Sequence, residues 1–144
     1  MRIIVVFYHP KNPQNVRDLL NICRHVGAEL IIIPRPSFSY NANVLAVRSL
    51  DEAISKAPLR SPILVLETYA KKLISECVKE LCNKDSIVVL LGAEDYGIPL
   101  EEIAKLPSDR VVLCRIPMSV SGASYNVVSS FVMLLYELLK CREG

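Results

Sequence analysis

The stretch from Ile116 to Lys140 reads IPMSVSGASYNVVSSFVMLLYELLK and contains the clearest sign of a ligand site in the chain. A short apolar strand end reaches Pro117, small residues follow at 119–123, and Ser124-Tyr125-Asn126 precedes a long apolar helical pattern. The first N–H groups of a helix lack partners within the helix and point outward, so a polar loop at a helix start can hold a small ligand. We expect the rest of the chain to complete this site.

Length and composition indicate a single folded domain over residues 1–144. The net charge of +2 neither requires nor excludes a nucleic acid partner, because a basic patch can lie on a balanced protein. No apolar run reaches the ~18 residues of a membrane span, and Met1-Arg2 leads straight into a strand-like run without a signal-peptide layout. We therefore expect a cytoplasmic protein without a membrane partner.

Cysteine and histidine are the residues that most often bind metals, and neither is grouped here. Each cysteine lies in an apolar or helical segment, so we expect buried, reduced thiols that pack as small hydrophobic groups. The two histidines, His9 and His25, have no partner at ligand spacing, so no metal site is expected. The five cysteines, which show no CxxC spacing, are Cys23, Cys77, Cys82, Cys114 and Cys141.

Continuous apolar runs rich in β-branched residues predict strands that are buried on both faces, at 2–8, 29–33, 63–66, 86–91 and 110–116. Residues 44–47 add a candidate short edge strand. Apolar residues at helical spacing predict helices between the runs, at 15–26, 49–57, 70–81, from 99, and at 125–140. This alternation predicts an α/β fold, with a parallel sheet of five to six strands and helices on both faces.

In a parallel sheet, ligands gather in the loops that leave the carboxyl ends of the strands. Among these loops, Gly92 to Ile98 (GAEDYGI) has two glycines around acidic residues, which allows the backbone to approach a ligand closely. The alternative is an ordinary strand-to-helix loop with glycine at its turns. The loop at 34–43 is polar and rich in turn residues, so we expect it at the surface.

Two further groups of polar residues have both functional and structural interpretations. A serine nucleophile in loop 117–124 would need a histidine and a carboxylate nearby, whereas Ser124 and Asn126 also suit the N-cap of the last helix. Arg17 and Asn21 share one helical face, with Arg24 adjacent, and either meet a phosphate or form a solvated surface.

Three separated stretches resemble the motifs of one family, the SpoU-type (TrmH-like) RNA 2′-O-ribose methyltransferases of the SPOUT superfamily. The match spans nearly the whole chain, in the family's order and spacing, and is similar to the minimal members that consist of the catalytic domain alone. The matching residues are 12–16 with Cys23 and 26–28, then 91–98, and then 116–118, 124–127 and 135–137.

The resemblance implies features that periodicity does not reveal. They are a trefoil knot at the C-terminal end, a homodimer formed through the C-terminal helix, and S-adenosylmethionine bound in the knotted loops. The implied reaction is methylation of an RNA ribose 2′-hydroxyl, in tRNA or rRNA. In such an enzyme the cofactor supplies the electrophile and the protein supplies positioning and electrostatics.

Carried over position by position, the resemblance implies three groups of site residues. The cofactor would contact Leu66, Glu67, Gly92, Gly97, Ile116, Met118 and Ser124. Catalytic positions would be Glu94 and Asn126, and the RNA would meet Asn15, Asn21 and Arg24.

One departure concerns the first motif, where the family has an Arg that is held to assist deprotonation of the ribose hydroxyl. The corresponding residue here is Asn21, which carries no charge. Arg17 lies one turn earlier on the same face, and we hypothesise that it substitutes as the catalytic residue. The alternatives are a non-catalytic RNA-binding or assembly module with the same scaffold, or methylation of a base.

Overall fold

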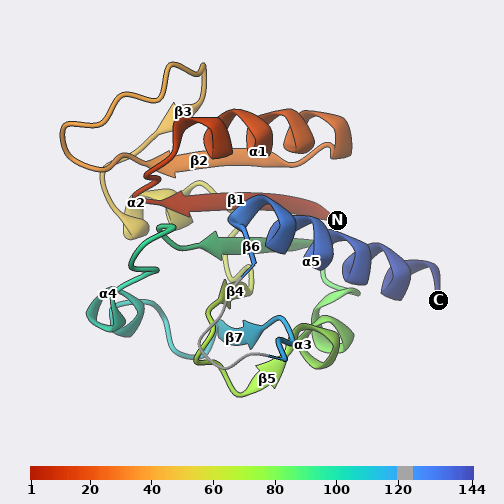
Figure 1. Cartoon of the computed structure of the whole chain (residues 1–144). Helices are drawn as coiled ribbons and strands as arrows, with labels where there is room; N and C mark the ends of the chain where they lie inside the picture. Colours follow the sequence, from red (N-terminus) through yellow and green to blue (C-terminus); the bar gives the residue numbers. More distant parts are fainter. Residues whose placement is uncertain (120–124) are drawn as a thin grey trace.

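The computed structural model describes residues 1–119 and 125–144, which form one parallel sheet of seven strands flanked by helices (Figure 1). The strand order is β3-β2-β1-β6-β4-β7-β5, and every pairing is parallel. The strands are β1 (Arg2–Tyr8), β2 (Glu29–Ile33), β3 (Leu45–Ala46), β4 (Ile63–Leu66), β5 (Lys72–Leu73), β6 (Ser86–Leu91) and β7 (Val111–Arg115). The helices are α1 (Pro13–Val26), α2 (Leu50–Ser55), α3 (Ile74–Leu81), α4 (Leu100–Ala104) and α5 (Val127–Glu143).

The central strands are apolar throughout because both faces of the sheet are covered. Along β1, Val5 and Phe7 join a core under α1, α3 and α5, while Ile4 and Val6 join a second core on the opposite face. That second core is closed by α2 and by Leu106, just after α4. Helices on both faces of a parallel sheet are therefore confirmed.

Local sequence signals define the helix ends. Asn12 caps α1 by accepting a hydrogen bond from the Gln14 N–H, and Gly27 ends the helix with a φ of 73°. Ser49 accepts from the N–H of Glu52 at 3.1 Å, and the Glu52 carboxylate accepts from the Arg48 N–H at 2.9 Å. Ser49 thus caps α2, and Glu52 reaches back to the residue before the cap instead of closing a reciprocal capping box with Ser49.

Seven strands replace the predicted five to six. The short edge strand at 44–47 is present as β3, and the difference is β5, where we predicted the first turn of a helix over 70–81. Residues 72–73 instead pair with 114–115 of β7, and α3 begins only at Ile74. Helical spacing of apolar residues does not reveal an edge strand of two residues, because its pairing depends on a partner about 42 positions away.

The position of β7 is unusual for consecutive elements. It lies between β4 and β5, although β4 and β5 follow each other along the chain. The connection at 67–71 therefore crosses β7 near its carboxyl end, because Leu66 before it and Lys72 after it both pair with Cys114. The trefoil knot implied by the resemblance would involve these segments, and it stays a prediction.

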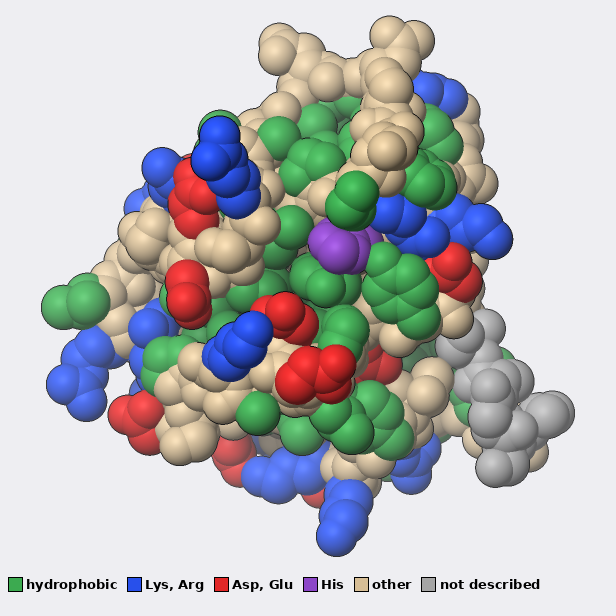
Figure 2. Space-filling view, turned by 90° about the vertical axis from the view of Figure 1, so that its left-hand side faces the viewer, with side chains coloured by type: hydrophobic (Ala, Val, Ile, Leu, Met, Phe, Trp, Pro, Cys, Tyr) green, Lys and Arg blue, Asp and Glu red, His purple; other side chains and the backbone are tan. Residues whose placement is uncertain are grey.

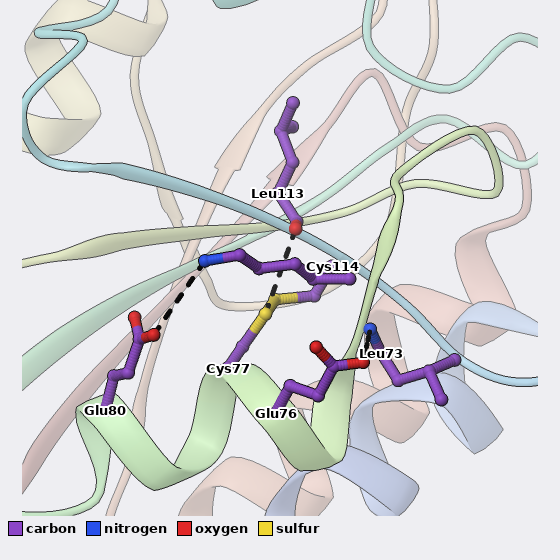
Figure 3. The surroundings of a disulfide bond; sticks show 7 residues. Leu73, Glu76, Cys77, Glu80, Leu113 and Cys114 are labelled. Atoms are coloured by element: carbon purple, nitrogen blue, oxygen red, sulfur yellow. Dashed lines mark hydrogen bonds and ion pairs between the residues drawn. A yellow bond between two sulfur atoms is a disulfide. The ribbon is translucent and has the colours of Figure 1, made fainter.

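The prediction that all cysteines are reduced is wrong for four of the five. Disulfides join Cys77 to Cys114 and Cys82 to Cys141, and Cys23 is buried and free. Figure 3 shows the first of these bonds, between α3 and β7. The Cα atoms are 6.6 and 6.1 Å apart, within the range of disulfides, because packing brings α3 against β7 and α5. Sequence separations of 37 and 59 residues carry no sign of that proximity.

In the part of the chain that the structure describes, no helix has the length and hydrophobicity to span a membrane. Among the same residues, no three His, Cys, Asp or Glu side chains are grouped so that they could bind a metal ion.

Candidate active site

A cavity of about 1470 Å³ opens where the loops after β1, β4, β6 and β7 meet the start of α5. Figure 2 shows this side of the molecule, with hydrophobic and acidic side chains toward the middle and most basic side chains toward the rim. The cavity therefore lies at the carboxyl edge of the sheet, as expected for a parallel α/β fold.

Most of the predicted site residues lie together in this cavity. Its walls include Asn15, Leu66, Glu67, Gly92, Glu94, Gly97, Ile116, Met118 and Asn126. The predicted contact at Ser124 lies outside the described residues. In the described part of the chain, the cavity walls lack three of the predicted residues, Arg17, Asn21 and Arg24.

Glu94 holds the loop that precedes α1. One carboxylate oxygen accepts a hydrogen bond from the Lys11 N–H at 2.7 Å, and the other accepts from the Asn12 N–H at 2.8 Å. The second oxygen also accepts from Nδ2 of Asn15 at 3.1 Å. Hydrogen bonds to a charged acceptor are about twice as strong as neutral ones, so this carboxylate fixes both the loop and the Asn15 amide.

Asn15 links this loop to the start of α5. Its side chain is buried, and Oδ1 accepts a long hydrogen bond of 3.5 Å from Nδ2 of Asn126. Asn126 also caps α5, because its Oδ1 accepts from the N–H groups of Val128 at 2.8 Å and Ser129 at 3.4 Å. The cap interpretation of Asn126 is therefore correct, and the same side chain also lines the cavity. Three segments far apart in the sequence thus share one polar chain.

Glu67 is a partly buried carboxylate at the end of β4. Oε1 accepts from the Ile98 N–H at 2.8 Å. Burial raises the pKa of Glu67, and the Ile98 N–H partly offsets that rise. A buried carboxylate next to an open cavity is suited to accept hydrogen bonds from a cationic ligand.

Two glycines let the loop after β6 fold tightly beside this carboxylate. Gly97 has a φ of 65°, and a Cβ there would lie 2.7 Å from Oε1 of Glu67. A Cβ on Gly92 would lie 2.7 Å from the backbone of Gly97. A larger residue at Gly92 would displace the backbone of Gly97, and one at Gly97 would displace the Glu67 carboxylate or the loop. Close approach therefore requires glycine at both positions, and the dihedral angle requires it at Gly97 as well.

Arg17 and Asn21 lie on the exposed side of α1. Arg17 donates to Oε1 of Gln14 at 2.9 Å and to the carbonyl of Tyr40 at 3.4 Å. The carbonyl of Asn21 pairs with Nδ1 of His25 at 2.8 Å, and the Asn21 side chain is exposed. In this arrangement the structure does not bring Arg17 to the cavity wall.

The loop at 34–43 contributes an ion pair and aromatic contacts that our reading of the sequence missed. Arg35 forms a two-pronged ion pair with Asp95 at 2.7 and 3.0 Å, which lowers the pKa of Asp95 to about 2. Tyr40 is buried rather than at the surface, and its hydroxyl donates to the carbonyl of Pro10 at 2.7 Å. The signal in the sequence that could have indicated these contacts is the aromatic and basic composition of the loop.

Comparison with known proteins relates the whole chain to one family. The sequence profile described as the SpoU rRNA methylase family matches residues 2–136. A tRNA (cytidine(34)-2′-O)-methyltransferase of Aeromonas hydrophila is 26% identical over 142 residues, covering 92% of this chain and 90% of its own. The enzyme of that name from Escherichia coli K12 is 24% identical over 146 residues, covering 92% and 89%.

Solved structures share the fold. One, described as giving structural insights into the 2-OH methylation of C/U34 on tRNA, matches with a TM-score of 0.80 at 18% identity, covering 99% of this chain and 97% of its own. The SpoU methyltransferase AviRb from Streptomyces viridochromogenes, in complex with AdoMet, matches with a TM-score of 0.77 at 17% identity, covering 99% and 62%.

Proposed function

Because the chain belongs to the SpoU rRNA methylase family, we propose that this S-adenosylmethionine-dependent RNA methyltransferase methylates a ribose 2′-hydroxyl of tRNA. The observation that carries the proposal is the hydrogen-bonded chain of Glu94, Asn15 and Asn126 on the wall of one cavity. The choice of tRNA rests on the curated relatives, which are named for 2′-O-methylation of cytidine 34 in tRNA.

The cavity fits the cofactor. Its volume of about 1470 Å³ exceeds the ~300 to 1000 Å³ of typical small-molecule sites, which leaves space for a nucleotide of the substrate. Leu66, Ile116 and Met118 offer apolar contacts, the Glu67 carboxylate offers an acceptor for an ammonium group, and Gly92 and Gly97 keep the loop backbone close. When bound, S-adenosylmethionine supplies an electrophilic methyl group on a sulfonium.

The polar chain positions groups for the RNA. We assign Glu94 a positioning role, because both of its oxygens already hold the loop before α1 and the Asn15 amide. Among the described residues, the single hydrogen bond to Oδ1 of Asn15 is the 3.5 Å contact with Asn126, and an amide oxygen has two lone pairs, so it can accept a hydrogen bond from a ribose hydroxyl. Asn21 and Arg24, both exposed on α1, are proposed to contact the RNA beyond the cavity.

We propose that Arg17, in place of the Arg that is absent at position 21, assists removal of the hydroxyl proton by donating hydrogen bonds to the ribose alkoxide that forms while water accepts the proton. To reach the cavity, its guanidinium would leave Gln14 and the Tyr40 carbonyl when RNA binds. Arg17→Ala should lower kcat roughly 100-fold or more, with unchanged affinity for S-adenosylmethionine, because loss of one donor to a developing oxyanion costs about 10²- to 10³-fold. Arg48→Ala, which removes another exposed arginine, is the matched control, and full activity of Arg17→Ala would exclude Arg17 from the mechanism.

Methyl transfer tests the function directly. Calorimetry with S-adenosylmethionine should show binding, and incubation with bulk tRNA and tritiated cofactor should label the RNA. Alkali cleaves RNA through attack by the 2′-hydroxyl, so label on a ribose 2′-oxygen should be recovered in alkali-resistant dinucleotides. Label in mononucleotides would assign the reaction to a base, and no cofactor binding at millimolar concentration would refute the enzyme assignment.

We also propose that the protein is a homodimer formed through α5. The inner side of this helix is buried in the core, yet Val132, Tyr136 and Leu139 are 46, 63 and 53% exposed. Their spacing of four and three residues places them on one stripe. An apolar stripe on the outside of a helix whose inside is already packed is suited to a second copy of the chain.

A cytoplasmic location is proposed from the tRNA substrate. Disulfides are rare in that compartment, except in hyperthermophiles, whose intracellular proteins are often disulfide-rich. A hyperthermophilic source would therefore reconcile the two disulfides with a tRNA substrate.

The second candidate is a non-catalytic RNA-binding or assembly module, favoured by Asn21 and by the position of Arg17 outside the cavity walls of the described chain. This candidate predicts tRNA binding without label transfer, so the tritium experiment separates the two functions.

A further inference from the structure

Tyr96 is a half-exposed aromatic residue on the cavity wall, and the proposed methyl transfer gives it no role. It lies in the loop after β6, two residues beyond Glu94, and is 49% exposed. Its hydroxyl is 2.7 Å from Nδ1 of His9. Because the hydroxyl already has a partner, the ring itself is the surface that Tyr96 offers to a ligand.

Arg35 supports this ring from behind. Its guanidinium carbon lies 4.6 Å from the centroid of the Tyr96 ring and 5.1 Å from that of the Phe38 ring. The same guanidinium donates to both oxygens of Asp95, and through Nε and Nη2 it donates to the carbonyl of His9 at 3.2 and 2.9 Å. With these partners Arg35 is a fixed support and not a free contact for a phosphate.

Arg35 covers one face of the Tyr96 ring, and the His9 ring meets Tyr96 edge-on at 89° and 6.1 Å between centroids. Among the residues that the structure describes, these contacts leave the other face of the ring for a ligand. A rigid aromatic face beside a cavity is a platform on which an unstacked RNA base can stack.

We propose that Tyr96, supported by Arg35, is a substrate-positioning residue that stacks on the base of the nucleotide whose ribose is methylated. This inference rests on the proposed function, which places the ribose that is methylated in the cavity. A base that turns out of the RNA stack brings its own ribose with it. The stacking tolerates different bases, since every base has a π face, so Tyr96 positions the nucleotide without selecting its identity.

A double-mutant cycle between the protein and the RNA tests the stacking of Tyr96 on the base. The probes are an anticodon stem-loop hairpin with cytidine at position 34, the nucleotide named for the curated relatives, and the same hairpin with an abasic ribose there. Tyr96→Leu should raise KM or Kd for the cytidine hairpin roughly 5- to 150-fold and leave the abasic hairpin within about twofold. Tyr96→Phe should behave as wild type, and Leu59→Ala, which removes a 91% exposed leucine outside the cavity walls, is the control.

The outcomes separate the two proposals. Equal losses on both hairpins, or a changed oligomeric state of Tyr96→Leu, would refute the stacking role while the methyltransferase assignment stands. If Tyr96→Leu does not fold, the wild-type protein alone still tests the stacking role. Stacking requires that the wild type binds the cytidine hairpin roughly 5- to 150-fold more tightly than the abasic hairpin. A wild type that transfers no methyl group to either hairpin or to bulk tRNA would refute both proposals.

Discussion

At the residue scale, Gly97 combines two constraints that can be separated by experiment. Its φ of 65° disfavours other residues, and a Cβ there would also meet the Glu67 carboxylate at 2.7 Å. Gly27 has a similar φ of 73°, but its Cβ would meet nothing within 4 Å. The difference between the two positions therefore isolates the effect of close approach.

Replacement of either glycine by alanine should lower the free energy of unfolding of the protein by about 1 kcal/mol for the dihedral angle alone. Gly97→Ala should lose more, because either Glu67 or the loop must move, and its affinity for S-adenosylmethionine should fall, whereas Gly27→Ala should bind normally. Urea unfolding and calorimetry measure the two effects. Equal stability and equal affinity in the two variants would contradict the role assigned to the contact with Glu67.

At the scale of elements, the ion pair between Arg35 and Asp95 joins the loop at 34–43 to the loop after β6. The pKa of Asp95 is lowered to about 2 by its hydrogen bonds with Arg35, whereas an unfolded aspartate titrates near 3.8. The ion pair therefore stabilises the fold fully above about pH 4 and loses that effect as the pH falls through 2. The Tm difference between wild type and Asp95→Asn should be largest from pH 5 to 7 and should shrink toward pH 2, and a constant difference would contradict this assignment.

The elements themselves were largely predictable, and the reasons are local. The five longer strands are apolar runs rich in β-branched residues, and the caps at Asn12 and Ser49 depend on residues two or three positions away. Features that depend on contacts between distant segments were missed, such as β5, both disulfides and the support of Tyr96 by Arg35. No local period in the sequence encodes such pairings.

The candidate site shows the same division. Glu94, Asn15 and Asn126 lie together as the motif resemblance implies, because motif positions carry information about distant contacts that periodicity lacks. The prediction for Arg17 rested instead on its position one helical turn before Asn21 in α1. The structure places the Arg17 guanidinium on Gln14 and the Tyr40 carbonyl. The roles of these residues in the reaction stay predictions.

At the scale of the whole molecule, the disulfides fasten both ends of the segment 114–141 to α3. Cys114 at one end bonds Cys77 of α3, and Cys141 at the other end bonds Cys82 just after α3, so residues 77–82 and this segment form one covalent ring. The ring contains the loop after β7, part of which lines the cavity, and α5. It holds the proposed cofactor loop and the proposed dimer helix to one support.

Loss of this ring should lower stability more than loss of a surface contact. Closing 59 residues by the bond between Cys82 and Cys141 removes chain entropy worth about 4 kcal/mol from the unfolded state. The double variant Cys82→Ser with Cys141→Ser should therefore melt well below wild type without reductant. Addition of reductant should lower the Tm of wild type more than that of the variant. A wild-type Tm that is insensitive to reductant, with thiol titration confirming reduction, would contradict the contribution of the disulfides.

The outer stripe of α5 determines whether the molecule functions as one copy or two. Val132 is 46% exposed on a helix whose opposite side is fully packed, so a charge there leaves the monomer core intact and removes only apolar contact with a partner. Val132→Lys should convert a dimer to a monomer in light scattering, because an unpaired buried charge at an interface costs several kcal/mol. Leu59→Lys places the same charge on a residue that is 91% exposed in a loop and should leave the mass unchanged. If RNA binding at the cavity needs the second copy, Val132→Lys should lose methyl transfer together with its dimeric mass, and Leu59→Lys should keep both. A Val132→Lys variant that remains dimeric would place the interface on another surface.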